Sequence, residues 1–191
     1  MAQSAHHVFS FADYVRVEED SPIKHEFFKG QVWAMAGGSP RHAAIAARII
    51  AALTLQLRDR PCEVFTSDLR VRVSATGLGT YPDASVVCGS LLIDVEDPKR
   101  HTITNPKVLV EVTSPSTEEY DRGDKREQYQ TIPSLEELVL VSQDTQSIYI
   151  WRRESDGWSE HIVTGSAVAE LASISCRLSL DEIYRDPLQG G

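Results

Sequence analysis

Long hydrophobic runs are missing from this sequence. No apolar stretch approaches the roughly 20 residues that a membrane-spanning helix needs. The first ten residues, MAQSAHHVFS, also lack the basic and apolar regions of a secretory signal peptide. We therefore expect neither a membrane protein nor a secreted one, and predict a cytoplasmic location.

Cysteine is scarce as well. The three cysteines, Cys62, Cys88 and Cys176, are far apart, odd in number and form no C-x-x-C pair. This pattern predicts reduced thiols in a cytosolic protein and argues against a structural zinc site. The histidines are scattered without the spacing of metal ligands, which argues in the same direction.

Positive charge is in short supply. The chain has 19 Lys and Arg against 28 Asp and Glu, and its formal net charge is −9. Affinity for nucleic acid comes largely from Lys and Arg on phosphates. The acidic chain as a whole has no electrostatic attraction for nucleic acid, so any such binding must be local, metal-assisted or weak.

The composition is otherwise that of a soluble globular protein. Of the 191 residues, 41% are hydrophobic and 25% are charged, and there is no internal repeat, low-complexity tract or linker. The length is close to that of a single domain, so we expect one domain over residues 1–191.

The periodicity predicts a mixed α/β fold, in which a central mixed β-sheet is flanked by helices and accompanied by additional hairpins. The clearest helix begins after Ser39, a plausible N-cap, with Pro40 at its first position. A hairpin is expected to turn near Lys29 and Gly30. Helices are expected within 10–20, 39–60, 120–132 and 179–184, and strands within 23–38 (the hairpin), 62–67, 69–74, 81–89, 107–112, 137–143, 146–153 and 158–164.

Two carboxylates are attached to apolar strands. Glu111 interrupts the strand 107–112, where an uncompensated charge costs several kcal/mol, and Asp83 precedes another apolar strand. If these strands are neighbours, the two carboxylates lie side by side and repel unless a cation or a proton intervenes. Mg²⁺ or Mn²⁺ is the natural cation for oxygen ligands. Alternatively, Glu111 pairs with Lys107 or an arginine, and Asp83 is a turn residue.

Basic residues follow in the segment DRGDKRE. Lys125 lies 14 positions after Glu111, so a strand, a turn and one helical turn can return its ammonium to the strand. The alternative is an ion pair with Asp121 at i, i+4, worth about 0.3–0.5 kcal/mol on an exposed helix. Gly123 weakens the helix by about 1 kcal/mol, so we expect the helix to begin near Asp121 with that residue as its cap.

Three blocks in order, YPDAS, VLVEVTSPST and YDRGDKREQYQTIPSLEELVLVSQ, carry a resemblance. The chain resembles the Uma-two family of proposed bacterial endonucleases from about Glu26 to Arg152. The resemblance implies the restriction-endonuclease-like fold of the PD-(D/E)XK superfamily, with Asp83 and Glu111 as its two acids. The usual superfamily lysine is absent because its position is Thr113, and the family pattern implies Lys125 in its place.

Two further residues match the family less specifically. Glu26 in KHEFFKG is either a third acid near the metal or a solvated residue of the hairpin. His42 in SPRHAAI is either functional or a packed or capping histidine at the start of the long helix.

The implied function is metal-dependent hydrolysis of phosphodiester bonds, with DNA as the substrate by resemblance. The metal ligands are expected to be Asp83, Glu111 and the backbone carbonyl of Val112. Lys125 is expected to orient the attacking water or stabilise the transition state, and Arg122 at most to position a phosphate. Two other classes remain open: a catalytically inactive nucleic-acid-binding or protein-interaction module, and a hydrolase of small phosphate esters.

A homodimer is also expected, because cutting both strands of a duplex usually requires two sites and two-fold dimers are the commonest assembly. The strands within 137–143 and 146–153, with Trp151 and Trp158 nearby, offer one possible surface. The alternative is that these strands are simply core.

Overall fold

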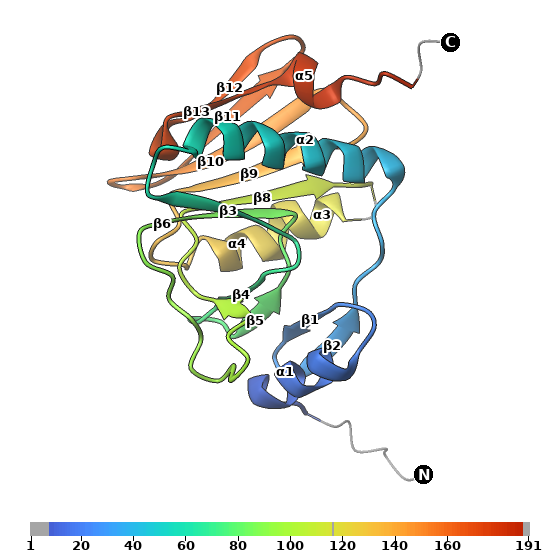
Figure 1. Cartoon of the computed structure of the whole chain (residues 1–191), viewed down its shortest axis with the longest axis vertical. Helices are drawn as coiled ribbons and strands as arrows, with labels where there is room; N and C mark the ends of the chain where they lie inside the picture. Colours follow the sequence, from blue (N-terminus) through green and yellow to red (C-terminus); the bar gives the residue numbers. More distant parts are fainter. Residues whose placement is uncertain (1–7, 116, 189–191) are drawn as a thin grey trace.

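The computed structural model describes residues 8–115 and 117–188, and its centre is a six-stranded mixed β-sheet with strand order β11-β10-β9-β8-β6-β3 (Figure 1). The pair β8–β9 is parallel and the other pairs are antiparallel. The strands are β3 (Cys62–Thr66), β6 (Ala84–Cys88), β8 (Val108–Thr113), β9 (Glu137–Ser142), β10 (Ser147–Glu154) and β11 (Gly157–Thr164).

The central strands β8 and β9 are buried along their whole length, as expected for nearly continuous apolar runs covered on both faces. Alternation sends Val108, Val110 and Val112 to one face of the sheet and Leu109 to the other. Glu111 points to the same face as Leu109, so the carboxylate lies under whatever covers that face.

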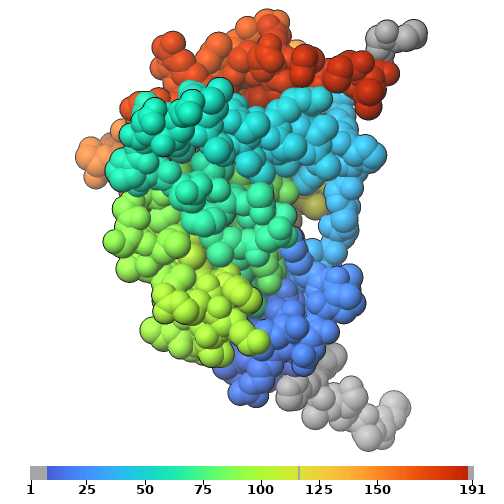
Figure 2. All heavy atoms as spheres, in the orientation of Figure 1, coloured from blue at the N-terminus to red at the C-terminus, as the bar shows by residue number. Residues whose placement is uncertain are grey.

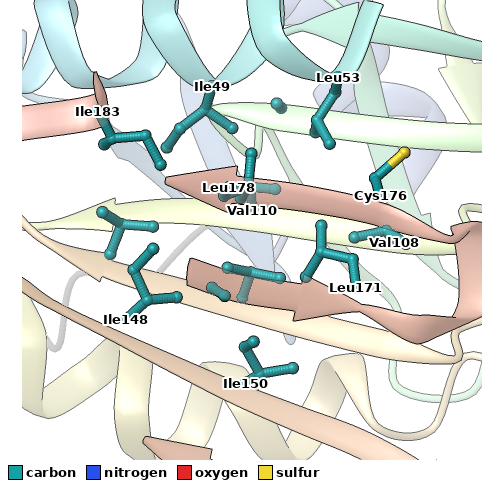
Figure 3. Close-up of a cluster of buried hydrophobic side chains, with 14 of the residues drawn as sticks. Ile49, Leu53, Val108, Val110, Ile148, Ile150, Leu171, Cys176, Leu178 and Ile183 are labelled. Carbon is teal, nitrogen blue, oxygen red and sulfur yellow. The ribbon is translucent and has the colours of Figure 1, made fainter. Parts of the chain in front are cut away.

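Helix α2 (Pro40–Leu57) covers the first face. Its N-cap is Ser39, whose hydroxyl accepts a hydrogen bond from the His42 N–H, and Pro40 begins the helix, so the predicted start is confirmed. Ile49 and Leu53 of α2 face Val110 of the sheet (Figure 3). The C-terminal elements complete this face: β12 (Val168–Leu171), the 3₁₀ turn η2 (Ala172–Ile174), β13 (Cys176–Ser179) and α5 (Leu180–Tyr184).

A second sheet, with strand order β2-β1-β5-β4-β7, lies on the opposite side of the central sheet from α2 (Figure 1). Its strands are β1 (His25–Phe28), β2 (Gln31–Ala34), β4 (Arg70–Val73), β5 (Leu78–Thr80) and β7 (Thr102–Ile103). Helix α1 (Phe11–Asp20) packs on it through Phe11 and Tyr14 against Phe27. Lys29 and Gly30 form the predicted hairpin turn, both with positive φ.

A kinked helical segment covers the second face of the central sheet. It runs through α3 (Glu118–Tyr120), the π-helical turn η1 (Asp121–Lys125) and α4 (Arg126–Tyr129). The prediction that this helix begins at Asp121 was wrong: it begins at Glu118, and Asp121 is buried inside it. Gly123 absorbs the kink with φ −99° and ψ −109°, which is outside the helical region.

The cysteine expectation was also wrong for one pair. Cys62 on β3 and Cys88 on β6 are direct cross-strand partners, with Cα atoms 3.9 Å apart, and they form a disulfide. Sequence spacing could not show this, because 26 positions separate the two residues and the strand register brings them together. Within the described residues, Cys176 is the free cysteine, and it is buried.

The surface suggested for a dimer is not available. Strand β9 is buried throughout and Trp151 of β10 is 4% exposed, so these strands are core, as the alternative held. The dimer itself stays a prediction without an assigned surface. In the described part of the chain, no helix has both the length and the apolar character needed to cross a membrane.

Candidate active site

The ends of β6 and β8 bring the two predicted acids together. Antiparallel pairing aligns Ala84 with Val110, so Asp83 comes next to Glu111 just past the last pair. The Asp83 Oδ2 atom accepts a hydrogen bond from the Val112 N–H at 2.7 Å. Asp83 is therefore fixed to the strand that carries Glu111, and is more than a turn residue after Pro82.

The partners of Glu111 are Lys125 and Tyr129. Its Oε1 atom lies 3.0 Å from Lys125 Nζ and accepts a hydrogen bond of 2.6 Å from the Tyr129 hydroxyl. Lys107, which is closer in sequence, instead pairs with Glu136 at 2.7 Å. The alternative pairing of Glu111 with Lys107 was therefore wrong, because the cation arrives from the helical segment on the buried face.

Lys125 lies among three carboxylates. Its Nζ atom is 2.9 Å from Glu26 Oε1 and 3.6 Å from Asp121 Oδ1, in addition to its contact with Glu111. The lysine is 5% exposed. The i, i+4 pair with Asp121 exists, but it is buried rather than a contact on a solvated helix face.

Glu26 reaches this cluster from the second sheet. It lies on β1, and its Oε1 atom accepts a hydrogen bond from the Thr80 hydroxyl on β5. The structure thus places Glu26 beside Lys125 and not as a solvated hairpin residue. The cluster consequently lies between the central sheet and the second sheet.

His42 contacts the other acid. Its Nε2 atom is 2.8 Å from Asp83 Oδ1, while its backbone N–H takes part in the N-cap of α2. Both oxygens of Asp83 are therefore bonded, one to His42 and one to Val112. The start of α2 and the ends of β6 and β8 meet at this point.

Arg122 is the predicted residue that the structure does not bring to the acids. Its guanidinium lies 3.1 Å from Glu118 and 3.9 Å from the centroid of the Tyr149 ring. The kinked segment directs Lys125 to the buried side and Arg122 to β10, so the two residues do not share a helix face.

Sequence reasoning missed two members of the cluster, Asp121 and Tyr129. Both are buried and contact the partners of Glu111 or Glu111 itself. The available signal was their spacing: residues 121, 125 and 129 recur every four positions, which puts them on one face of a helix.

Burial and charge shift the pKa values of this cluster. Burial raises the pKa of Glu111 to about 8, against the opposing effect of Lys125, and Asp121 and Asp83 add to the rise. Burial also raises the pKa of Asp121. For Lys125, burial opposes the charge, but the surrounding acidic groups outweigh it and raise the pKa well above the ordinary value. The hydrogen bond to Asp83 raises the pKa of His42.

The sequence profile of the Uma2 family, described as "Putative restriction endonuclease", matches residues 11–181. The chain belongs to the Uma2 family. Two Synechocystis proteins are similar to it: slr1290 is 39% identical over 175 residues (91% of this chain and 90% of that protein), and sll1609 is 30% identical over 154 residues (78% and 83%).

A solved structure shares the fold of this Uma2 chain. It is the crystal structure of a "putative nuclease belonging to DUF820" from Anabaena variabilis, with a TM-score of 0.75 and 15% identity over 92% of this chain and 97% of that one. The predicted family and the mixed fold class are thereby confirmed. The identity is low, so this likeness shows the fold alone.

Proposed function

We propose that this Uma2 chain is a metal-dependent nuclease that hydrolyses phosphodiester bonds in DNA. The observation that carries the proposal is the grouping of Asp83, Glu111 and the Lys125 ammonium at the ends of β6 and β8. Two adjacent acids and a nearby ammonium are the groups that phosphodiester hydrolysis needs: ligands for a cation, and a charge to stabilise the transition state.

The donor chemistry fits a hard divalent cation. Asp83 and Glu111 supply carboxylate oxygens, and the Val112 carbonyl lies on the same strand edge as its N–H, which is the edge that faces Asp83. Among residues 8–115 and 117–188, no group of three or more His, Cys, Asp and Glu side chains is arranged to hold a metal. Mg²⁺ typically keeps several waters and binds through one or two carboxylates, and Asp83 and Glu111 are two adjacent carboxylates.

The remaining residues have roles that follow from their contacts. A bound divalent cation would supply Lewis acidity and lower the pKa of a water molecule. The positive charge of the Lys125 ammonium, which its three carboxylate neighbours hold in place, would stabilise the charge that develops on the phosphate in the transition state. Glu26 holds that ammonium, Tyr129 holds Glu111, and His42 holds Asp83.

One observation favours a second candidate, a catalytically inactive nuclease-fold module that binds nucleic acid or protein. The Lys125 ammonium compensates Glu111 without any metal, so the cluster has a structural explanation of its own. A third class, hydrolysis of small phosphate esters, needs the same acids and differs only in substrate.

The deciding experiment is nicking of supercoiled plasmid with Mg²⁺ or Mn²⁺, compared with EDTA. We expect metal-dependent nicking that Asp83→Asn and Glu111→Gln each abolish, together with weakened Mn²⁺ binding in calorimetry. Asp68→Asn is the matched control, because Asp68 is an exposed acid paired with Lys24 outside the site.

Each alternative gives a different result. Absence of nicking by well-folded protein at every metal concentration would reject the proposal in favour of the inactive module. Cleavage of a chromogenic phosphodiester without cleavage of DNA would assign the small-ester class. Unchanged Mn²⁺ binding in both site variants would remove the metal site.

A further inference from the structure

Three arginines gather at one cavity beside the candidate site. Arg41 and Arg48 of α2 and Arg185 after α5 line a cavity of about 410 Å³, a size typical of ligand sites. The N-terminal half of α2 and the C-terminal segment lie against each other at this place (Figure 2). Asp186 is the acid in the lining, and apolar residues such as Ile45 and Leu188 supply much of the rest.

These arginines differ from most basic residues of the chain. Ten of the 19 lysines and arginines form ion pairs with carboxylates within the described residues. Arg41 and Arg48 instead donate to backbone carbonyls, those of Gln143 and Ile183. Arg185 makes no hydrogen bond or ion pair in the part of the chain that the structure describes. Their positive charge is therefore not neutralised by any carboxylate at contact distance.

Of the three arginines that line the cavity, Arg41 is the one whose neighbour in the sequence contacts Asp83. Arg41 precedes His42, whose ring contacts Asp83. Arg41 also donates to the carbonyl of Gln143, and the Gln143 N–H donates to the carbonyl of Thr113, two residues after Glu111. Arg41 therefore lies at the end of the central sheet where β8 and β9 end, near His42 and Asp83. It is on the face that α2 covers, whereas Glu111 points to the other face.

We propose that this arginine-lined cavity binds phosphate groups of a nucleic-acid backbone next to the bond to be cut. The inference rests on the proposed nuclease function. It assigns the surface through which this acidic protein would bind the negatively charged DNA backbone. With a net charge of −9, affinity for DNA requires such a local concentration of positive charge. Guanidinium groups suit phosphate because they present paired N–H donors to its oxygens.

Binding of a short fluorescein-labelled DNA duplex, measured by anisotropy across a salt series in EDTA, tests the inference without cleavage. We expect Arg41→Gln/Arg185→Gln to weaken binding and to reduce the slope of log affinity against log salt by about two, at ~0.9 for each phosphate that the protein no longer neutralises. Arg185→Glu alone should weaken binding with no loss of folding, because its guanidinium holds no described partner.

The matched control is Arg58→Gln/Lys99→Gln, which removes the same charge from exposed residues outside the cavity. Its salt slope should stay at the wild-type value. An equal decrease in the control would show a general charge effect and overturn the inference, and so would an unchanged slope in the cavity variants.

Calorimetry with inorganic phosphate separates the source of the phosphate. Arginine-dependent binding of inorganic phosphate, without arginine-dependent binding of duplex, would reassign the cavity to a small anion and overturn the proposal. The outcome is also separable from that of the nuclease proposal. Arginine-dependent binding without nicking would reject the nuclease alone, whereas nicking without arginine dependence would reject this inference alone.

Discussion

Replacing Lys125 by methionine should strongly destabilise the protein at neutral pH. Its ammonium lies within 3.6 Å of an oxygen of Glu26, Glu111 and Asp121, and none of these four side chains is more than 15% exposed. Methionine keeps most of the volume but leaves three largely buried acidic side chains without their cation, and those that are ionised at this pH then carry an uncompensated charge. Removing one partner of a buried ion pair typically costs about 3–5 kcal/mol.

This free energy corresponds to a measurable change in melting temperature. For a protein of this size 1 kcal/mol is worth about 2–4 °C, so Lys125→Met should lower Tm by roughly 6–20 °C in calorimetry at pH 7.5. The decrease should shrink as the pH is lowered, because protonated carboxyl groups no longer need a cation. The double variant with Glu26→Gln should recover part of the stability at pH 7.5.

Lys107→Met is the matched control. Lys107 makes a similarly short contact with Glu136, 2.7 Å, but the two side chains are 25% and 48% exposed. Ion pairs in such surroundings contribute about 0–1 kcal/mol. Equal decreases in Tm for Lys107→Met and Lys125→Met, or a decrease in Lys125→Met that does not change with pH, would refute the reasoning.

Further predictions concern the same cluster and the disulfide. Because the pKa of Glu111 is about 8 in the folded protein, above its usual 4.5, the folded state holds this proton more tightly, and stability should fall as pH rises from 4.5 to 8. Urea titrations should show a shallower decline in Glu111→Gln; an identical pH profile would contradict the shift. Tyr129→Phe, which removes a hydrogen bond to Glu111, should cost about 1–2 kcal/mol in the same titrations, and no measurable cost would argue against that bond. Reducing the disulfide between Cys62 and Cys88, which are 26 positions apart, should lower stability by about 3 kcal/mol, and a Tm unaffected by reductant would mean that the bond is absent. Sedimentation should give a dimer mass, whereas a monomer at micromolar concentration would remove the dimer.

The elements that the sequence predicts well are those with local signals. Helix α2 carries its own cap in Ser39 and Pro40, and β8 and β9 are apolar enough to be recognised as buried strands. The acids Asp83 and Glu111 are also visible locally, because a carboxylate attached to an apolar strand needs an explanation. The sequence predicts that these two acids are neighbours only if their strands are adjacent in the sheet, because strand order cannot be deduced from any one segment.

The features that were mispredicted depend on register and on distant contacts. The Cys62–Cys88 bond follows from the antiparallel pairing of β3 with β6, which spacing along the chain does not encode. For Glu26 the sequence leaves two alternatives open, a third acid near the metal or a solvated hairpin residue, because its environment is made by β5 and by the helical segment.

The charge of Glu111 illustrates both kinds of information. The need for a cation can be predicted from the local sequence, whereas the identity of that cation depends on distant contacts. A buried carboxylate in a strand requires a cation, and the sequence offered a metal, a lysine four positions earlier, or a lysine 14 positions later. The distant lysine reaches it because Gly123 permits a kink that a uniform helix would not have, and the kinked segment directs Asp121, Lys125 and Tyr129 to the buried face. Gly123, which destabilises a regular helix, therefore helps to bring the Lys125 ammonium to the acids.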